Sequence, residues 1–431
     1  MKTIYLKDLS NKNYQKIINR SAGNYQNVIP VVKNIMNDVK QNGDEALIKY
    51  FRKFNGNSNY SIKVTKEELD KAYNQVDIQV IFALRQMIKN ITEVCKAQVK
   101  TKKDQIVETE KGIKVWREWR AIEKVGLYIP GGKAIYPSSV LMTAIPAQIA
   151  GCKEIIICTP PQSNGQINPV VLLAAEMLGI KQIYKVGGAE AIAAMVYGTQ
   201  TIPQVYKIFG AGNIYVTAAK ILALEKIAID MPAGPSEVLI IADETANPKF
   251  IAADLLADGE HGEDSACVLL TTSKKVAEET ITEINKQLPK LKTQDRAKAS
   301  LKKYSLFAVV DSIDEAIEFV NEYAPEHLEI MTRNPEKLVG KITNAGSVFL
   351  GDYTSKASGD YATGANHILP TGGMAKMYPP LGVDAFGKWM QVQKCTKNGL
   401  LKIKTTIENI AETEGLPAHK NSASIRFKGV I

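Results

Sequence analysis

The sequence predicts an α/β protein with two Rossmann-like lobes, each built on a parallel sheet. From residue 125 onward, short apolar runs alternate with longer amphipathic segments, which is the pattern of βαβ units. The alternation begins again after Pro235. The chain has 431 residues, which exceeds the size at which one hydrophobic core stops growing. We therefore expect at least two lobes.

The elements are predicted in chain order. The first hundred or so residues read as helical: Thr65 to Glu68 form a capping box, and residues 77–99 carry apolar side chains at helical spacing. The stretch from Val125 predicts a strand that enters a glycine turn. Helices at 138–150, 169–178, 189–197 and 215–225 then alternate with strands at 154–158, 182–186 and 205–209. The second set has strands at 238–242, 267–271, 306–310, 328–331 and 347–350, and helices at 249–256, 275–288 and 314–323.

The end of the chain has a different composition. Residues 351–380 are rich in Gly, Ser, Thr and Pro, which predicts an ordered functional loop. After them come a strand-like run at 389–393, a helix at 400–412 and a polar tail. This segment is too small to fold alone, so we expect it to pack on another body, such as a partner subunit.

Composition excludes several classes of protein. The formal charge of +9 is scattered, and the densest basic cluster, Lys100 to Lys103, has no interleaved aromatic residues, so no nucleic-acid groove is expected. No apolar run is long enough for a membrane span, and the N-terminus lacks a secretory signal. The cysteine count of five is odd and includes no CxxC pair, which argues against a disulfide framework or a cysteine zinc site and fits a reducing cytoplasm.

All four histidines lie in turn-rich segments at the ends of predicted elements, where α/β folds place their sites. They are His261, His327, His367 and His419. Asp258 and His261 are three residues apart, so at a helix end both side chains can face one point. Because thiolates are not grouped, a zinc site would need histidine and carboxylate donors. Asp258, His261, Asp360 and His419 are plausible donors, although a single histidine is more often a surface or hydrogen-bonded residue.

Glu326 and His327 form a different pairing. Adjacent residues on a regular helix point about 100° apart. At a helix-to-strand junction after Pro325, the two side chains can converge instead. A dehydrogenase needs a base for the hydroxyl proton, and histidine titrates in the right range. The alternative is a histidine stabilised by the dipole at a helix C-terminus.

Seven blocks of the sequence together resemble the histidinol dehydrogenase family. They occur in the family's order between residues 125 and 422, and they read VGLYIPGGKAIYPSSVLMTAIPAQIAGC, KIFGAGN, MPAGPSEVLIIAD, DGEHGEDS, APEHLEI, GDYATGANHILPT and EGLPAHKNS. The resemblance implies that zinc binds the imidazole and amino nitrogens of L-histidinol. Two NAD+ molecules then oxidise the alcohol through L-histidinal to L-histidine, the last step of histidine biosynthesis.

The resemblance also implies the roles of individual residues. It implies that His327 takes the alcohol proton and that Glu326 activates the water that attacks the aldehyde. The zinc ligands and the substrate contacts would be Asp258, His261, Asp360 and His419, with Ser236, His327 and Glu414 also against the substrate. The chain lacks a GxGxxG motif, so the positions expected to contact NAD come from the resemblance alone: Tyr128, Glu190 and Asn213. Gly187-Gly188 is either a weak anion-binding turn or an ordinary strand-to-helix turn.

The resemblance further implies a homodimer with an exchanged C-terminal tail, so that Glu414 and His419 complete the partner's site. The expected divisions are an N-terminal helical arm at 1–24, a discontinuous catalytic domain at 25–127 and 238–380, an NAD-binding domain at 128–237, and the exchanged tail at 381–431.

Three positions depart from the family pattern. The family usually has glutamine at Asp258 and at Glu190, and proline at Ala211. The added carboxylates leave open a related dehydrogenase that acts on another small polar alcohol, such as a sulfonated diol. A third alternative is a metallohydrolase, because a zinc-bound hydroxide needs the same kinds of ligands.

Overall fold

The computed structural model describes residues 2–20, 25–55, 60–99, 104–131 and 134–427. The basic cluster Lys100 to Lys103 lies outside these residues. The chain divides into two compact units: residues 1–98 with 122–386, and residues 99–121 with 387–431. Each unit is described by itself.

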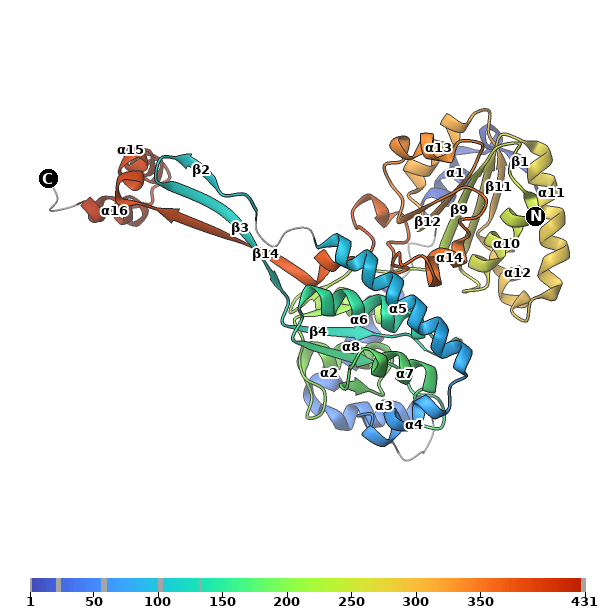
Figure 1. The fold of residues 1–431 in the computed structure, drawn as a ribbon, viewed down its shortest axis with the longest axis horizontal. Helices are drawn as coiled ribbons and strands as arrows, with labels where there is room; N and C mark the ends of the chain where they lie inside the picture. The colour runs from blue at the N-terminus through green and yellow to red at the C-terminus, as the bar shows by residue number, and fades with distance from the viewer. Residues whose placement is uncertain (1, 21–24, 56–59, 100–103, 132–133, 428–431) are drawn as a thin grey trace. The chain divides into compact units, whose positions relative to one another are not determined.

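The first unit contains a six-stranded parallel sheet in the order β1-β11-β10-β9-β12-β13. Its strands are β1 (Ile4–Tyr5), β9 (Glu237–Ala242), β10 (Ala266–Thr271), β11 (Leu306–Val309), β12 (His327–Met331) and β13 (Ser347–Leu350). Val238 and Ile240 of β9 face a core with α10 and α11, whereas Leu239 and Ile241 face a core with α13. Helices thus cover both faces of the sheet, as Figure 1 shows.

The helices of this lobe are α1 (Asn11–Ile18), α10 (Pro248–Gly259), α11 (Lys274–Gln287), α12 (Gln294–Lys303), α13 (Ile313–Tyr323) and α14 (Lys356–Tyr361), with short 3-10 turns η1 (Leu6–Asp8), η3 (Leu288–Lys290), η4 (Pro335–Lys341) and η5 (Met374–Lys376). The turn η6 (Val383–Phe386) packs instead on the lobe of the second sheet. Five of these six α-helices begin with a side-chain cap, and α12 is the exception. Asn247 accepts a hydrogen bond from Lys249 N before α10, and Ser355 accepts one from Ser358 N before α14. The expected loop at 351–380 therefore contains a helix, α14.

A second parallel sheet has five strands in the order β6-β5-β4-β7-β8. Its strands are β4 (Lys124–Tyr128), β5 (Glu154–Cys158), β6 (Ile183–Tyr184), β7 (Lys207–Phe209) and β8 (Ala228–Ile229). The connecting helices are α6 (Pro137–Ala150), α7 (Pro169–Met177), α8 (Gly188–Tyr197) and α9 (Ile214–Ala223). The expectation of two lobes with parallel sheets is confirmed.

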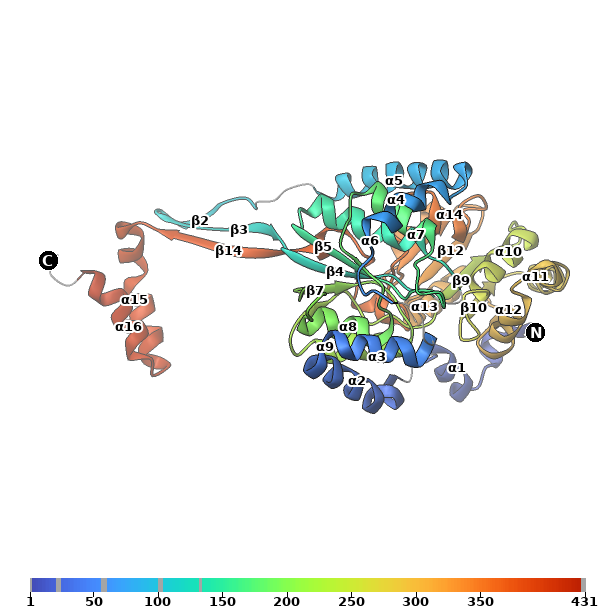
Figure 2. The ribbon, with the colours of Figure 1, turned by 90° about the horizontal axis from the view of Figure 1, so that it is seen from below.

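The N-terminal helices pack on this second lobe. They are η2 (Tyr25–Val28), α2 (Ile29–Asn42), α3 (Asp44–Asn55), α4 (Lys66–Asn74) and α5 (Ile78–Gln98). Helix α2 contacts α8 and α9, α4 contacts α7, and α5 contacts α6; Figure 2 shows α2 and α5 on opposite sides of the sheet. The capping box at Thr65 is confirmed. The assignment of residues 25–127 to the catalytic domain stays a prediction.

The second unit is an antiparallel sheet with two helices. Strand β3 (Ile113–Ala121) pairs with β2 (Val107–Glu110) and with β14 (Gly387–Cys395). Helices α15 (Lys397–Thr413) and α16 (Pro417–Ser424) follow, with a final turn η7 (Ile425–Phe427). The predicted strand and helix of the tail are confirmed, while β3 and α16 were not predicted. Within the described residues, no helix is long and apolar enough to cross a membrane.

Candidate active site

A buried cluster of charged side chains lies at the amino edge of the six-stranded sheet. His327 is the first residue of β12, and its register partner on β9 is Val238, the residue after Glu237. The chain segments that precede these two parallel strands, with Ser236 and Glu326, therefore lie side by side. Asp258 joins them from the last turn of α10, which returns the chain to this edge. The predicted convergence at the junction after Pro325 is thus seen in the structure.

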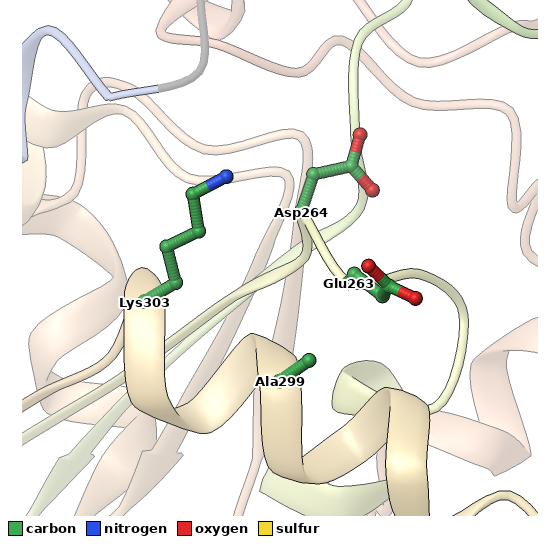
Figure 3. A pocket seen from close by; sticks show the side chains of 4 residues that line it. All are labelled: Glu263, Asp264, Ala299 and Lys303. Atoms are coloured by element: carbon green, nitrogen blue, oxygen red, sulfur yellow. The ribbon is translucent and has the colours of Figure 1, made fainter.

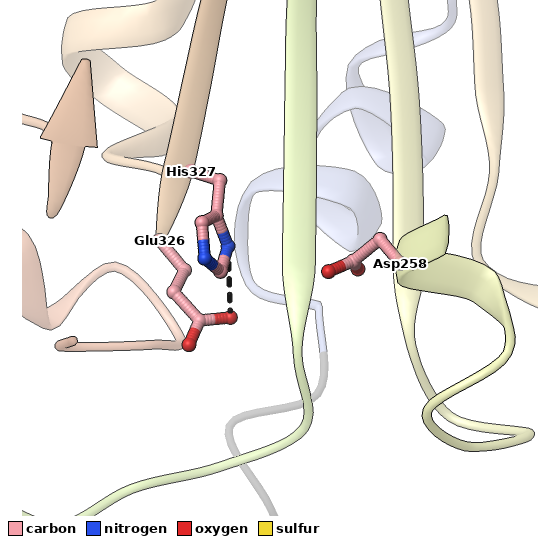
Figure 4. A group of neighbouring side chains, drawn as sticks. All are labelled: Asp258, Glu326 and His327. Atoms are coloured by element: carbon pink, nitrogen blue, oxygen red, sulfur yellow. Dashed lines mark ion pairs between the residues drawn. The ribbon is translucent and has the colours of Figure 1, made fainter. Parts of the chain in front are cut away.

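The imidazole of His327 has one engaged nitrogen and one free nitrogen. Nδ1 lies 3.0 Å from the carbonyl oxygen of Glu237 and 3.4 Å from Glu326 Oε2, so its proton belongs there. Nε2 is buried without a hydrogen-bond partner among the described residues, 3.5 Å from Asp360 Oδ1. Figure 4 shows the ring beside Glu326 and facing Asp258. A buried bare nitrogen is suited to accept a proton or to bind a cation.

The charge of Glu326 controls the protonation of this ring. Burial by itself would lower the pKa of His327, but the Glu326 carboxylate, with a further contribution from Asp360, raises the pKa to about 10. Glu326 is itself fixed, because Oε2 accepts a hydrogen bond of 2.8 Å from Glu237 N. Its geometry therefore does not depend on solvent.

Ser236 connects two of the predicted site carboxylates. Its Oγ lies 2.8 Å from Asp258 Oδ1 and 3.0 Å from Glu326 Oε2. A hydroxyl has one proton, so Ser236 donates to one carboxylate at a time. Asp258 Oδ2 is buried and has no partner among the described residues. An orphaned buried carboxylate oxygen is costly unless a cation or a donor satisfies it.

Lys356 contacts two of the predicted zinc ligands. Its Nζ lies 3.2 Å from Asp258 Oδ1 and 3.0 Å from Asp360 Oδ2. Burial opposes the charge of Lys356, yet Asp258 and Asp360 hold its pKa above the ordinary value. Burial would likewise raise the pKa of Asp360, but His327 and Lys356 hold that pKa below its ordinary value. Lys356 was not among the predicted site residues. Its spacing of four residues from Asp360 puts both side chains on one helix face, but only the packing of α14 against α10 brings Lys356 to Asp258.

The charge balance of the cluster suits a divalent cation. Four buried carboxylates face two buried cations, Lys356 and Arg20. The carboxylates are those of Glu237, Asp258, Glu326 and Asp360. One negative charge is left uncompensated when His327 is protonated, as its raised pKa favours at neutral pH, and two when it is neutral. Ligand atoms of Asp258, Glu326 and His327 also lie within 4.8 Å of one another. Carboxylate and imidazole donors are ligands that zinc accepts, so the cluster fits a zinc ion.

The remaining predicted ligands lie in two places. His261 follows α10 and is exposed, with Nδ1 3.1 Å from the carbonyl oxygen of Ala257. Glu414, at the end of α15, and His419, in α16, belong to the second unit. It stays a prediction that His261 and His419 bind zinc together with this cluster and that Glu414 contacts the substrate there. His367 lies next to it, with Nδ1 3.0 Å from the Asp360 carbonyl oxygen.

A separate cavity of about 700 Å³ lies at the carboxyl edge of the five-stranded sheet, lined by Glu190, Asn213 and the Gly187-Gly188 turn. Tyr128 is the last residue of β4, and its hydroxyl accepts a hydrogen bond of 3.1 Å from Gly188 N. Asn213 Oδ1 caps α9 by accepting from two backbone amides. The three positions expected to contact NAD thus come together at one strand edge. Their contact with a cofactor remains a prediction.

The wall of this cavity comes from the N-terminal helices. Phe51 of α3 stacks on Tyr60 with ring centroids 3.8 Å apart, and Tyr50 lines the same space. A flat aromatic portion of a ligand would suit such a wall.

The close approach of β7 to β4 requires a glycine at position 210. The φ of Gly210 is +112°, and a Cβ there would lie 2.1 Å from the Tyr128 carbonyl oxygen.

Another hollow, of about 370 Å³, is lined by Glu263, Asp264, Ala299 and Lys303 (Figure 3). It contains none of the predicted site residues. Its charged side chains are exposed to solvent, whereas those of the cluster are buried, so this hollow lacks the buried charges that mark a candidate active site.

Comparison with known proteins agrees with these features. A family model described as histidinol dehydrogenase matches residues 18–427. The chain is 47% identical over 423 residues to a histidinol dehydrogenase of Methanocaldococcus jannaschii, covering 98% of each, and 46% identical over 431 residues to one of Bacteroides fragilis, covering 100% of each. It matches the crystal structure of histidinol dehydrogenase from Elizabethkingia anophelis with a TM-score of 0.94 and 45% identity, over 100% of this chain and 98% of that one. The resemblance seen in the sequence is confirmed, and the chain belongs to the histidinol dehydrogenase family.

Proposed function

We propose that this chain oxidises L-histidinol through L-histidinal to L-histidine. Each histidinol consumes two NAD+ in turn, and each active site holds one zinc ion. The observation that carries the proposal is the position of His327 Nε2, which is buried without a hydrogen-bond partner among the described residues, beside a cluster in which buried carboxylates outnumber buried lysine and arginine side chains. The family relationship favours this reaction over a metallohydrolase. Asp258 and Glu190 remain the positions to examine if another alcohol proves to be the better substrate.

In the first oxidation, His327 Nε2 accepts the hydroxyl proton as a hydride passes from the carbinol carbon to NAD+. The carbonyl oxygen of Glu237 holds a proton on Nδ1, so Nε2 is the nitrogen that exchanges a proton with the substrate hydroxyl, as a base once it is deprotonated. The products of this step are the aldehyde, NADH and one proton. The low exposure of His327, 2%, excludes water from the ring.

In the second oxidation, Glu326 accepts a proton from the water that attacks the aldehyde carbon. The hydrate then loses a hydride to a second NAD+ and becomes the carboxylate, so that aldehyde, water and NAD+ give carboxylate, NADH and two protons. Glu326 is held by Glu237 N and lies beside Ser236, so it can act without rearrangement of its neighbours. Two NADH are formed for each histidinol.

The proposed zinc ligands are Asp258, His261, Asp360 and, from the partner subunit in a homodimer, His419. Bound zinc would supply a positive charge that holds the substrate nitrogens and polarises its oxygen. Ser236 and Glu414 would contact the substrate. The second unit exposes apolar side chains, including Leu401, Ile410 and Ile425, which supports its use as a subunit interface.

NAD+ is proposed to occupy the cavity at the carboxyl edge of the five-stranded sheet. Helix α8 begins there, so its first backbone amides offer positive charge to a pyrophosphate. Tyr128, Glu190 and Asn213 would be its contacts. A cytoplasmic setting is part of the proposal, supported by five cysteines that are all free thiols.

The test is a turnover assay. Purified protein with zinc, L-histidinol and NAD+ should form two NADH per histidinol at alkaline pH. A panel of other small polar alcohols, including a sulfonated diol, serves as the comparison. Absence of NADH with histidinol would overturn the proposal, and a clear preference for another alcohol would replace the substrate.

A further inference from the structure

Lys356 is the one described cation that contacts both Asp258 and Asp360. Its side chain is 2% exposed, and both carboxylates are buried. We propose that Lys356 is the internal counter-cation of the metal site: it shares these two carboxylates with the metal ion and lowers the affinity of the site for that ion. This inference rests on the proposed function, because it concerns the proposed zinc ligands.

The position of Lys356 is fixed by the fold. Helix α14 begins at Lys356 after the capping Ser355, and the spacing of four residues puts Lys356 and Asp360 on one helix face. Asp258 lies in the last turn of α10, and α10 packs against α14. Both carboxylates therefore stand on helices, and the ammonium bridges the two helices.

The ammonium between the two carboxylates affects both the stability of the metal-free protein and the binding of a metal ion. Two buried carboxylates at one site repel each other, and an ammonium between them removes that cost in the metal-free protein. A divalent cation needs the same oxygens and is repelled by the ammonium. Asp258 Oδ2 is unpartnered, so Asp258 keeps one oxygen for the metal while Oδ1 contacts Lys356.

Asp258 and Lys356 should therefore behave as a charge-compensated pair. The carboxylate of Asp258 adds a negative charge to the donor set, and the ammonium cancels it. Loss of the lysine alone leaves an excess of negative charge, and loss of the aspartate alone leaves an excess of positive charge. Loss of both restores the balance.

The experiment measures zinc affinity of the purified full-length protein by competition with a chromophoric chelator. Lys356→Met should bind zinc at least about tenfold more tightly than the wild type, since a tenfold change corresponds to about 1.4 kcal/mol. Asp258→Asn should bind at least about tenfold more weakly, and the double variant should lie near the wild type. Lys356→Arg, which keeps the charge, should leave the affinity nearly unchanged.

Thermal unfolding gives a second readout that separates this role from a purely structural salt bridge. Without zinc, Lys356→Met should have a lower Tm than the wild type, and zinc should raise the Tm of this variant more than that of the wild type. Lys220 is the matched control, because it is a buried lysine that pairs with Asp230 and lies in α9, in the lobe of the five-stranded sheet. Lys220→Met should lower Tm but leave zinc affinity unchanged. If Lys356→Met does not fold, Lys356→Gln, which keeps N–H donors without the charge, replaces it.

The outcomes separate this inference from the proposed function. If the protein forms NADH from histidinol and binds zinc, but zinc affinity is the same or weaker in Lys356→Met, the counter-cation role is wrong and the proposed function stands. If neither the wild type nor Lys356→Met binds zinc, both are overturned. Tighter binding in Lys356→Met with recovery in the double variant supports the inference.

Discussion

The two parallel sheets of the first unit carry their candidate binding sites at opposite edges. The five-stranded sheet has its cavity at the carboxyl ends of its strands, after Tyr128 and before Gly188. The six-stranded sheet has its charged cluster at the amino ends, around Glu237 and His327. Open α/β sheets usually bind ligands at the carboxyl edge, so the second arrangement departs from that rule.

Helix dipoles explain what each edge can bind. At a carboxyl edge the following helices begin, and the N-terminus of α8 offers positive charge to an anion. At an amino edge the helices that connect successive strands end. The C-terminal ends of α10 and α13 lie at this edge, where Asp258 contacts Lys356 and the carbonyl of Tyr323 accepts a hydrogen bond of 2.7 Å from Arg20. One edge is therefore suited to a dinucleotide, and the other to cations.

The largest effect is expected at the bare nitrogen of the amino edge. His327→Ala should lower the rate of histidinol oxidation by about 10²–10⁴-fold, because the step loses its base. Glu326→Ala should mainly slow the oxidation of histidinal, which needs an activated water. The measurement is steady-state NADH formation with histidinol and, separately, with histidinal.

Glu326→Gln is the control for geometry, since its amide oxygen can still accept the hydrogen bond from Glu237 N. If His327→Ala and Glu326→Ala reduce both half-reactions by equal factors, the separate roles are contradicted.

The next effect concerns the stability of the amino edge. The Arg20 guanidinium is 4% exposed, and its Nε lies 2.9 Å from Glu237 Oε1. Arg20→Ala should lower the free energy of unfolding by about 3–5 kcal/mol, because it leaves a buried carboxylate unpaired. The exposed pair Arg333–Glu244 provides the comparison, and Arg333→Ala should cost about 1 kcal/mol or less. Urea unfolding at one protein concentration measures both, and similar shifts would show that burial does not set the strength of the Arg20 pair.

Much of the fold was predictable because most strands and helices have strong local patterns. The strand predicted at 154–158 is β5, and the helix predicted at 138–150 is α6. Strand β3 was missed because it alternates charged and aromatic residues, and its main partner β14 lies far along the chain. Helix α12 was missed because it has few apolar residues to mark a helical period.

The site was predictable only in part. Asp258, Glu326 and His327 stand out because they lie at the ends of predicted helices and strands, where α/β folds place their sites. Lys356 does not stand out, since a lysine in a Gly- and Ser-rich stretch looks like a surface residue. Its meaning depends on the packing of α14 against α10, and no local pattern encodes that contact.

A smaller effect is expected in the pH dependence of stability, which reports whether buried carboxyl groups of the six-stranded lobe are ionised. Burial raises the pKa of Asp254 to about 6, and Glu329, also buried, has a pKa well above its ordinary value. Between pH 3.8 and about 6 the folded state keeps a proton on Asp254 that the unfolded chain has lost. Stability should therefore fall as pH rises through this window, by at most about 1.4 kcal/mol per pH unit.

Asp254→Asn should flatten this dependence. Urea midpoints of the wild type and the variant across the window would measure it, and parallel curves would mean that Asp254 is ionised in the folded state. In that case the ionised Asp254 would add a negative charge to those of the four carboxylates in the cluster.

The smallest effect tests the carboxyl edge. A Cβ on Gly188 would lie 2.2 Å from Glu190 Oε2, so the Glu190 carboxylate folds over the first turn of α8. There it competes with an anionic cofactor for the positive end of the helix. Glu190→Gln should lower the KM for NAD+ by about two- to fivefold, the equivalent of about 0.3–1 kcal/mol for a charge at a helix end. The zinc affinity should not change, because the two edges act on different ligands. A higher KM for NAD+ would instead assign Glu190 to binding ribose hydroxyls, and the anion preference of this edge would then depend on backbone amides alone.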